Sequence, residues 1–200
     1  TPSAWVAAPI IQGFRKRDWI GVGFMLFQDK AGAAGLTHGA AKLGATYHLG
    51  LDKRGNTVLS IGGHYGGEQR RIDTEKLKFE DGILNNGVTG ETIGGEAKYT
   101  DIDLGVVLSS RLNKTMSFNV GFSMYHVFTP NYSLIGSGGG GGTVTQGRAD
   151  IPRRAVTHGQ FNVELTDRWS MSPSFIFQTM SGNDEIMVQG LAGELFNTIR

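Results

Sequence analysis

The chain contains long stretches in which apolar and polar residues alternate with a period of two. From Leu36 to Leu51, one set of alternate positions is apolar or small: Thr37, Gly39, Ala41, Leu43, Ala45, Tyr47, Leu49 and Leu51. The positions between them carry small or polar residues, among them His38, Lys42 and His48. Because successive side chains of a strand point to opposite faces, this pattern predicts a strand with one apolar face.

A second run of the same kind extends from Thr57 to Arg71, and the turn-forming residues Asp52 to Asn56 lie between the two runs. Strands of soluble proteins usually have about five or six residues, whereas a tilted strand needs about 9–11 residues to cross a bilayer. Both arms of this hairpin are long enough to cross. We therefore expect an all-β protein, a transmembrane antiparallel up-and-down β-barrel, with residues 1–200 as a single domain.

Composition excludes several other classes of protein. The 200 residues include no Cys, so neither a disulfide framework nor a thiolate metal site is possible. The formal net charge of +1 gives no reason to expect nucleic acid as a partner. No apolar run approaches the ~20 residues of a transmembrane helix. The chain has no signal peptide at Thr1, and we expect that a signal has been removed or the chain trimmed.

Alternation elsewhere brings the predicted number of strands to nine. The further strands are expected at residues 3–14, 19–28, 99–111, 115–128, 154–165, 169–180 and 185–197. Pro9 lies within the first of them, and Pro in a strand is typical of an edge or a bulge. Single-chain bacterial barrels usually have an even number of strands, so strands are expected to be missing from one or both ends.

The predicted connections alternate between short and long. Short charged turns are expected at one end of the barrel, as at residues 15–18 and 112–114, and in an up-and-down barrel these share the periplasmic rim. Ile72–Lys98 and Thr129–Pro152 are predicted to be long loops on the cell-surface side. The second includes Gly138–Gly142, a run of glycines that is expected to be mobile.

The apolar positions of each strand are predicted to face lipid. They are Ile20, Val22, Phe24, Leu43, Tyr47, Leu59, Ile61, Leu104, Val106, Phe118, Val120, Phe122, Phe161, Phe175 and Phe177. Aromatic residues near the strand ends are candidates for interfacial girdles, or else ordinary core residues. These aromatic candidates are Trp19, Tyr47, Tyr65, Tyr99, Phe128 and Trp169.

Spaced motifs cover the chain from Trp19 to about Phe196. They are W-I-G-V-G-F-M-L-F-Q-D-K-A-G from Trp19, G-A-T-Y-H-L-G-L from Gly44, L-S-I-G-G-H-Y-G from Leu59, F-N-V-G-F-S-M-Y-H-V-F-T-P-N from Phe118 and M-S-P-S-F-I-F-Q from Met171. This set resembles the PorP/SprF family of Bacteroidota outer-membrane proteins, which belong to the type IX secretion system. The start and the last strands of the family have no counterpart here, and Gly138–Gly142 replaces a more varied loop.

The resemblance implies a protein of the bacterial outer membrane that cooperates with type IX secretion. Members of this family hold a secreted protein at the cell surface, often one with a type B C-terminal sorting domain. Other members take part in the secretion and gliding motility machinery itself. The implied role is therefore non-enzymatic, and its partners are a secreted protein or secretion components together with outer-membrane lipid.

Simpler structural roles explain most of the candidate site residues. His38, His48, His64 and His158 fall on predicted inward faces, where lumen packing and hydrogen bonding explain them better than a metal site. Asp101 and Asp103 complete no recognisable catalytic motif, and no G-x-S-x-G is present. We expect no enzyme activity, cofactor or metal. Partner contacts are expected at Asp29, Lys30, Gly32, Leu77, Phe79, Ile83, Leu84 and Asn131.

Two other function classes stay open at this point. An outer-membrane porin or small-molecule transporter would have an open lumen, and conductance in planar bilayers distinguishes it. A soluble ligand-binding barrel would have an apolar interior and a polar exterior, and recovery without detergent distinguishes that one. The motif Asp29–Gly32 also has a simpler interpretation as a turn, with Asp29 accepting backbone hydrogen bonds and Gly32 at positive φ.

Overall fold

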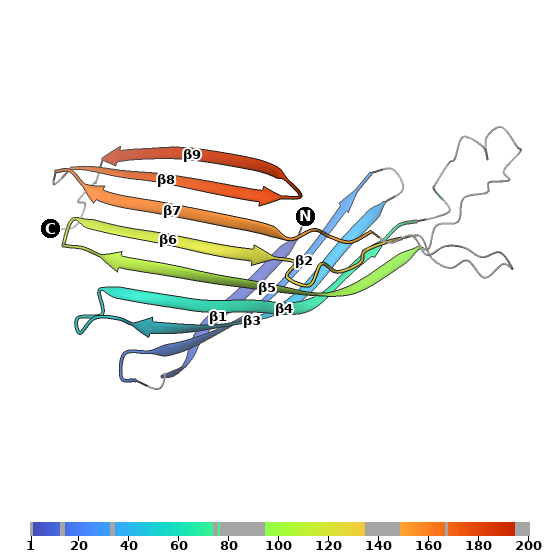
Figure 1. The fold of residues 1–200 in the computed structure, drawn as a ribbon, viewed down its shortest axis with the longest axis horizontal. Helices are drawn as coiled ribbons and strands as arrows, with labels where there is room; N and C mark the ends of the chain where they lie inside the picture. The colour runs from blue at the N-terminus through green and yellow to red at the C-terminus, as the bar shows by residue number, and fades with distance from the viewer. Residues whose placement is uncertain are drawn as a thin grey trace, which may run out of the picture.

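The computed structural model describes residues 2–12, 15–32, 35–73, 76, 95–134, 149–166 and 168–194, which form one antiparallel sheet (Figure 1). Its nine strands are β1 (Ser3–Gln12), β2 (Trp19–Ala31), β3 (Leu36–Gly50), β4 (Thr57–Arg71), β5 (Glu96–Arg111), β6 (Met116–Tyr125), β7 (Arg154–Glu164), β8 (Trp169–Met180) and β9 (Asn183–Glu194).

Each strand pairs with the next strand in the chain, so the order across the sheet is the sequence order from β1 to β9. This confirms an all-β, antiparallel, up-and-down architecture. β1 and β9 lie at the two ends of that order. Among the described residues, no helix is long and apolar enough to cross a membrane.

Predicted strand limits were wrong at the end of β2, at the starts of β5 and β9, and at the end of β6, which stops at Tyr125 instead of residue 128. The expected loop at Asp29 is instead part of β2, where Asp29 pairs with His38 and Ala31 with Leu36. A tighter turn suffices because Gly32 and Gly35 adopt φ of 75° and 62°, which favour glycine. β5 begins at Glu96, before the expected Tyr99, because its first residues continue the pairing with β4.

Pro9 lies where its chemistry predicts. β1 is at one end of the sheet order, and its register with β2 shifts between Pro9 and Ile11. Pro has no backbone N–H to donate to a ladder, so an edge strand with an irregularity accommodates it. The prediction of an edge or bulge position is confirmed.

The β1–β2, β3–β4, β5–β6 and β7–β8 connections, all short, share one end of the sheet (Figure 1). The other end has the short β2–β3 and β8–β9 turns together with the connections of residues 72–95 and 126–153. In the short β3–β4 turn, the Asp52 carboxylate accepts hydrogen bonds from the backbone N–H of Thr57 at 2.9 Å and of Arg54 at 3.2 Å. These donors, Thr57 foremost, hold the pKa of Asp52 below its ordinary value. The glycine run Gly138–Gly142 lies outside the described residues.

The register gives the sheet two unlike faces. One row across β2 to β5 consists of Phe24, Leu43, Tyr65 and Ile102, and we call the face that carries it the apolar face. The opposite face carries Lys42, Glu68, Asp101 and Asp103, and we call it the polar face. Leu43 and Tyr65 are 63% and 60% exposed, whereas Lys42 and Glu68 on the same strands are each 5% exposed. The sheet therefore curls around its polar face.

Candidate functional site

The polar face holds a buried group of charges contributed by three adjacent strands. Lys42 comes from β3, Glu68 from β4, and Asp101 and Asp103 from β5, and we call these four residues the Lys42 cluster. The strand register brings these side chains together, because Lys42 pairs with Gly66 and Gly66 pairs with Asp101. Glu68 and Asp103 are each two positions farther along their strands, so they point to the same face.

Gly66 makes room for the Lys42 side chain to pass over β4. A Cβ at Gly66 would collide with the backbone carbonyl oxygen of Ala41 and would lie 2.6 Å from Lys42 Cα and 2.8 Å from Lys42 Cγ. Real Cβ atoms do not approach other atoms this closely, so any larger residue would displace the β3 backbone as well as the lysine side chain. The glycine is needed because Lys42 must reach from β3 across β4 to the carboxylates of β5.

One ammonium group holds the cluster together. Lys42 Nζ is 2.7 Å from Glu68 Oε1, 2.7 Å from Asp101 Oδ2 and 2.9 Å from Asp103 Oδ2. All four side chains are almost entirely removed from solvent. Buried charges are tolerated when they are paired in this way, and loss of one partner is costly. The cluster has one positive and three negative groups, a formal charge of −2.

Two histidines and a tyrosine surround the carboxylates. His38 Nε2 is 2.9 Å from Glu68 Oε2, and the Tyr99 hydroxyl donates to the same oxygen at 2.8 Å. His126 Nδ1 is 2.9 Å from Asp101 Oδ2. These contacts and the Lys42 ion pairs link β3, β4 and β5 on the polar face.

The β6–β7 connection closes over the long-loop side of this cluster. His126 has a φ of 57°, and its backbone N–H donates to Asp103 Oδ1 at 3.2 Å. The next residue, Val127, donates to Ile102 O at 3.0 Å, so the connection lies along β5. Farther on, the Arg70 guanidinium lies 4.3 Å from the centre of the Tyr132 ring. Backbone and side-chain contacts thus fix the start of this connection against β4 and β5.

Asp101, Asp103 and His126 also present ligand atoms within 4.8 Å of one another, a grouping with the oxygen and nitrogen donors that metal ions use. In this structure, however, the Lys42 ammonium already bonds to both aspartates. A cation at the same carboxylates would have to displace it. The Lys42 ammonium therefore already neutralises part of the negative charge that would otherwise attract a metal ion to these residues.

A second polar group lies toward the short-turn end. The Trp19 ring stacks on His48 with centroids 4.8 Å apart, and His48 Nδ1 is 2.8 Å from Ser60 Oγ. The register places Trp19 and Tyr99 on the polar face, which favours the alternative of ordinary packed residues over girdle positions for both. The other predicted girdle residue of this region, Tyr47, lies on the apolar face and donates its hydroxyl to Asp18 Oδ2 at 2.7 Å.

The predicted inward histidines share the polar face, whereas the predicted partner residues are not brought together. Asp29 and Lys30 lie within β2, Gly32 is at the following turn, and Asn131 forms an isolated bridge with Asp150. The Asn131 side chain accepts hydrogen bonds from the backbone of Ser133 at 2.9 Å and Ala149 at 3.4 Å, so it helps to close its own loop. Leu77, Phe79, Ile83 and Leu84 lie outside the described residues.

The residues predicted to face lipid all lie on the apolar face. One row, for example, runs from Ile20 through Tyr47, Ile61 and Val106 to Phe122. Leu43, Ile61 and Leu104 are each more than half exposed, although they are large and apolar. An apolar surface that continues across a whole sheet needs a covering medium or partner.

Sequence reasoning placed Lys42, Glu68, Asp101 and Asp103 on polar faces but did not join them, and it did not single out His126. Comparison with known proteins adds the remaining evidence. A family model described as "Type IX secretion system membrane protein PorP/SprF" matches residues 6–197. A search of curated proteins finds no match to the chain.

Proposed function

Since the chain belongs to the PorP/SprF family of type IX secretion system membrane proteins, we propose that it is a non-enzymatic outer-membrane barrel that holds a secreted protein at the cell surface. The observation that carries this proposal is the family match over residues 6–197. The partner is a secreted protein with a type B sorting domain or a gliding or secretion component.

The apolar face supports a position within a membrane. Its exposed residues include Leu43, Ile61, Tyr65 and Leu104, in rows that extend across β2 to β5. Large exposed apolar surfaces are rare in soluble proteins, whereas transmembrane barrels present such a band to lipid. The polar residues on the other face correspond to the lumen side of such a barrel.

The Lys42 cluster favours a holding role over the alternative of a porin or small-molecule transporter. Its side chains bond to one another across β3, β4 and β5, and the start of the β6–β7 connection bonds to Asp101 and Asp103. These contacts occupy the lumen side of the strands instead of leaving charges free to line a channel. Stepwise conductance of the purified protein in planar bilayers would support the porin instead.

The cell-surface contacts are assigned to residues 72–95 and 129–152, the parts of the predicted loops Ile72–Lys98 and Thr129–Pro152 that lie outside the strands. In the first, Leu77, Phe79, Ile83 and Leu84 are the proposed apolar anchors, because a few buried apolar residues usually carry most of the binding energy. Asp29, Lys30, Gly32 and Asn131 belong to the same end of the sheet and extend the proposed contact area.

The test is to shorten each loop to a tight turn and to follow the surface protein on whole cells. We expect the barrel to assemble and the partner to be shed by at least one of the two variants. A matched control replaces Lys53 and Arg54 of the opposite β3–β4 turn by Gly and Ser, which should leave the partner in place. Full retention of the partner by both loop variants would mean that the loops do not hold it.

A further inference from the structure

Near the long-loop end of β2 to β5, the residues of the apolar face change from apolar to polar or small. Its last two rows across these strands are polar or small: Gln28, Gly39, Gln69 and Lys98, and beyond them Lys30, Thr37, Arg71 and Glu96. The rows before them, from Leu26 onward, are apolar apart from small residues and Thr100. This change marks the level at which a membrane surface would meet the sheet.

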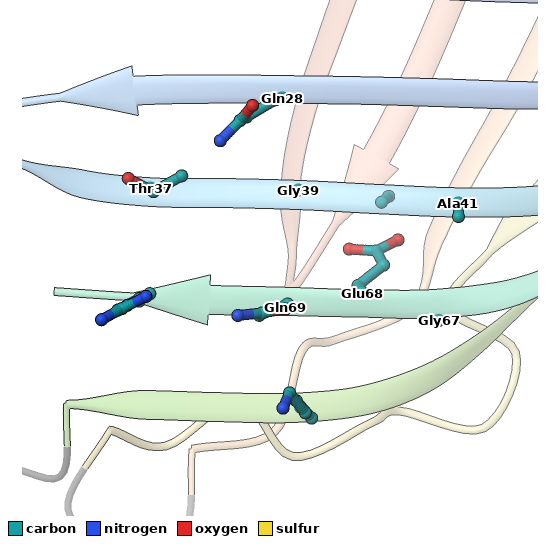
Figure 2. Close-up of a pocket in the computed structure, with 10 residues that line it drawn as sticks. Gln28, Thr37, Gly39, Ala41, Gly67, Glu68 and Gln69 are labelled. Carbon is teal, nitrogen blue, oxygen red and sulfur yellow. The ribbon is translucent and has the colours of Figure 1, made fainter.

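A groove of about 580 Å³ lies at that level. Figure 2 shows Gln28 on β2, Gly39 and Ala41 on β3, and Gly67 and Gln69 on β4 along this part of the sheet. The groove exists because small residues lower the surface between longer side chains. A Cβ at Gly67 would have no atom within 4 Å, so the space above this glycine is open.

Positive charge is concentrated at the outer end of the groove. Arg71 and Lys98 both line it, both are exposed, and Lys30 is exposed in the row beyond. The single acid in these two rows is Glu96, whose carboxylate is 2.9 Å from Lys98 Nζ. The lining itself contains two cations, Arg71 and Lys98, and one acid, Glu68, whose carboxylate is already paired with Lys42 on the polar face. The inner end is apolar, since the next row contains Leu43 and Tyr65.

We propose that this groove binds a phosphorylated lipid of the surrounding membrane. The phosphate lies at Arg71 and Lys98, and an acyl chain follows Ala41 and Gly67 toward Leu43 and Tyr65. A guanidinium binds phosphate through paired hydrogen bonds, and Lys98 adds a second charge. The continuity of the cationic end with the apolar rows favours a lipid over a free phosphate ion. The inference rests on the proposed membrane location, but its test does not depend on the secreted partner.

The first experiment measures lipid retention by native mass spectrometry of the protein in a non-ionic detergent. The probes are phosphatidylglycerol and diacylglycerol with identical acyl chains. We expect retention of phosphatidylglycerol but not of diacylglycerol. The double variant Arg71→Gln with Lys98→Gln should lower the affinity for phosphatidylglycerol about tenfold, because two cations are removed. The control is Lys53→Gln with Arg54→Gln, which changes the net charge equally at the opposite end and should keep the lipid.

The second experiment fills the groove without altering charge. Gly67→Leu should reduce phosphatidylglycerol retention, whereas Gly190→Leu should not, although Gly190 is also on the apolar face and also has open space around it. Displacement of the lipid by millimolar inorganic phosphate alone would identify a free-anion site and overturn the proposal. Equal retention by the wild type and the Arg71/Lys98 variant would overturn it as well. Neither result would affect the test of surface display.

Discussion

At the residue scale, Lys42 and Gly66 show how a small residue can determine the position of a charged one. Lys42 places its ammonium against three carboxylates that belong to β4 and β5. It does so by crossing Gly66, its direct neighbour on β4. One cation therefore joins the three carboxylates of the polar face. The path of the Lys42 side chain over β4 leaves no space for a side chain at position 66.

Replacing Lys42 with Met tests this arrangement. We expect Lys42→Met to destabilise the protein by ~3–5 kcal/mol, because Glu68, Asp101 and Asp103 would keep their charges without a buried partner. Urea unfolding in lipid vesicles, followed by tryptophan fluorescence, measures the change. Lys53→Met in the exposed β3–β4 turn is the control and should be nearly neutral. Equal effects of the two substitutions would show that the cluster does not stabilise the fold.

A pair of adjacent glycines provides a second test. Gly66→Ala should lower the free energy of unfolding by about 1–3 kcal/mol, because the added Cβ overpacks against Lys42 and the Ala41 backbone. Gly67→Ala, one position away on the opposite face, should be neutral or slightly stabilising, since no atom lies within 4 Å of its added Cβ. The midpoints of urea unfolding compare the two variants. The steric explanation is contradicted if Gly67→Ala is the more damaging change.

At the scale of the strands, alternation in the sequence carried most of the information. Residues 57–71 and 169–180 were predicted as strands with the limits that β4 and β8 have in the structure. Errors arose where a strand continued through polar residues, as at Asp29–Ala31, whose place is fixed by pairing with β3 and not by hydrophobicity.

The charge cluster was beyond the reach of the same reasoning. Lys42, Glu68 and Asp101 are far apart in the sequence, and they meet only through the register of three strands. His126 was missed because the predicted strand at residues 115–128 included it, whereas β6 ends at Tyr125 and His126 has a positive φ. One sequence signal was available. Asp101 and Asp103 lie on the wet face of their predicted strand, and Lys42 lies on the wet face of a strand in the preceding hairpin.

The two faces of β7 give a test at this scale. Phe161→Arg should lower folding stability in lipid by about 2–4 kcal/mol if Phe161 is near the bilayer midplane. Gln160→Arg, on the exposed polar side of the same strand, should have little effect. Refolding into vesicles under increasing urea measures both. Similar losses at these neighbouring positions would contradict the assignment of the faces.

At the scale of the whole molecule, the up-and-down order separates the two kinds of connection. One end has short connections only, whereas the connections of residues 72–95 and 126–153 lie at the other end with the β2–β3 and β8–β9 turns. In an outer-membrane barrel the long connections are extracellular and the short turns periplasmic. The proposed orientation follows from this rule, and it places the lipid groove at the outer surface.

The absence of Cys from the sequence makes this orientation easy to measure. We expect a membrane-impermeant maleimide to label Lys76→Cys on whole cells and Arg54→Cys only after the cells are opened. Both positions are exposed and lie in connections at opposite ends of the sheet. The reverse pattern would place the short turns at the cell surface and would remove the basis for loop-mediated holding.

The Lys42 cluster also has a consequence for the order in which the sheet assembles. The β3–β4 hairpin already contains a Lys42–Glu68 ion pair, so it is locally neutral before β5 joins. β5 then brings Asp101 and Asp103, whose charges are met only if it adds in the correct register. A shift of β5 by one residue would turn both aspartates toward the apolar face. The ion pairs of the cluster are therefore available to β5 in one register only, so they disfavour a misaligned pairing of β5 with β4.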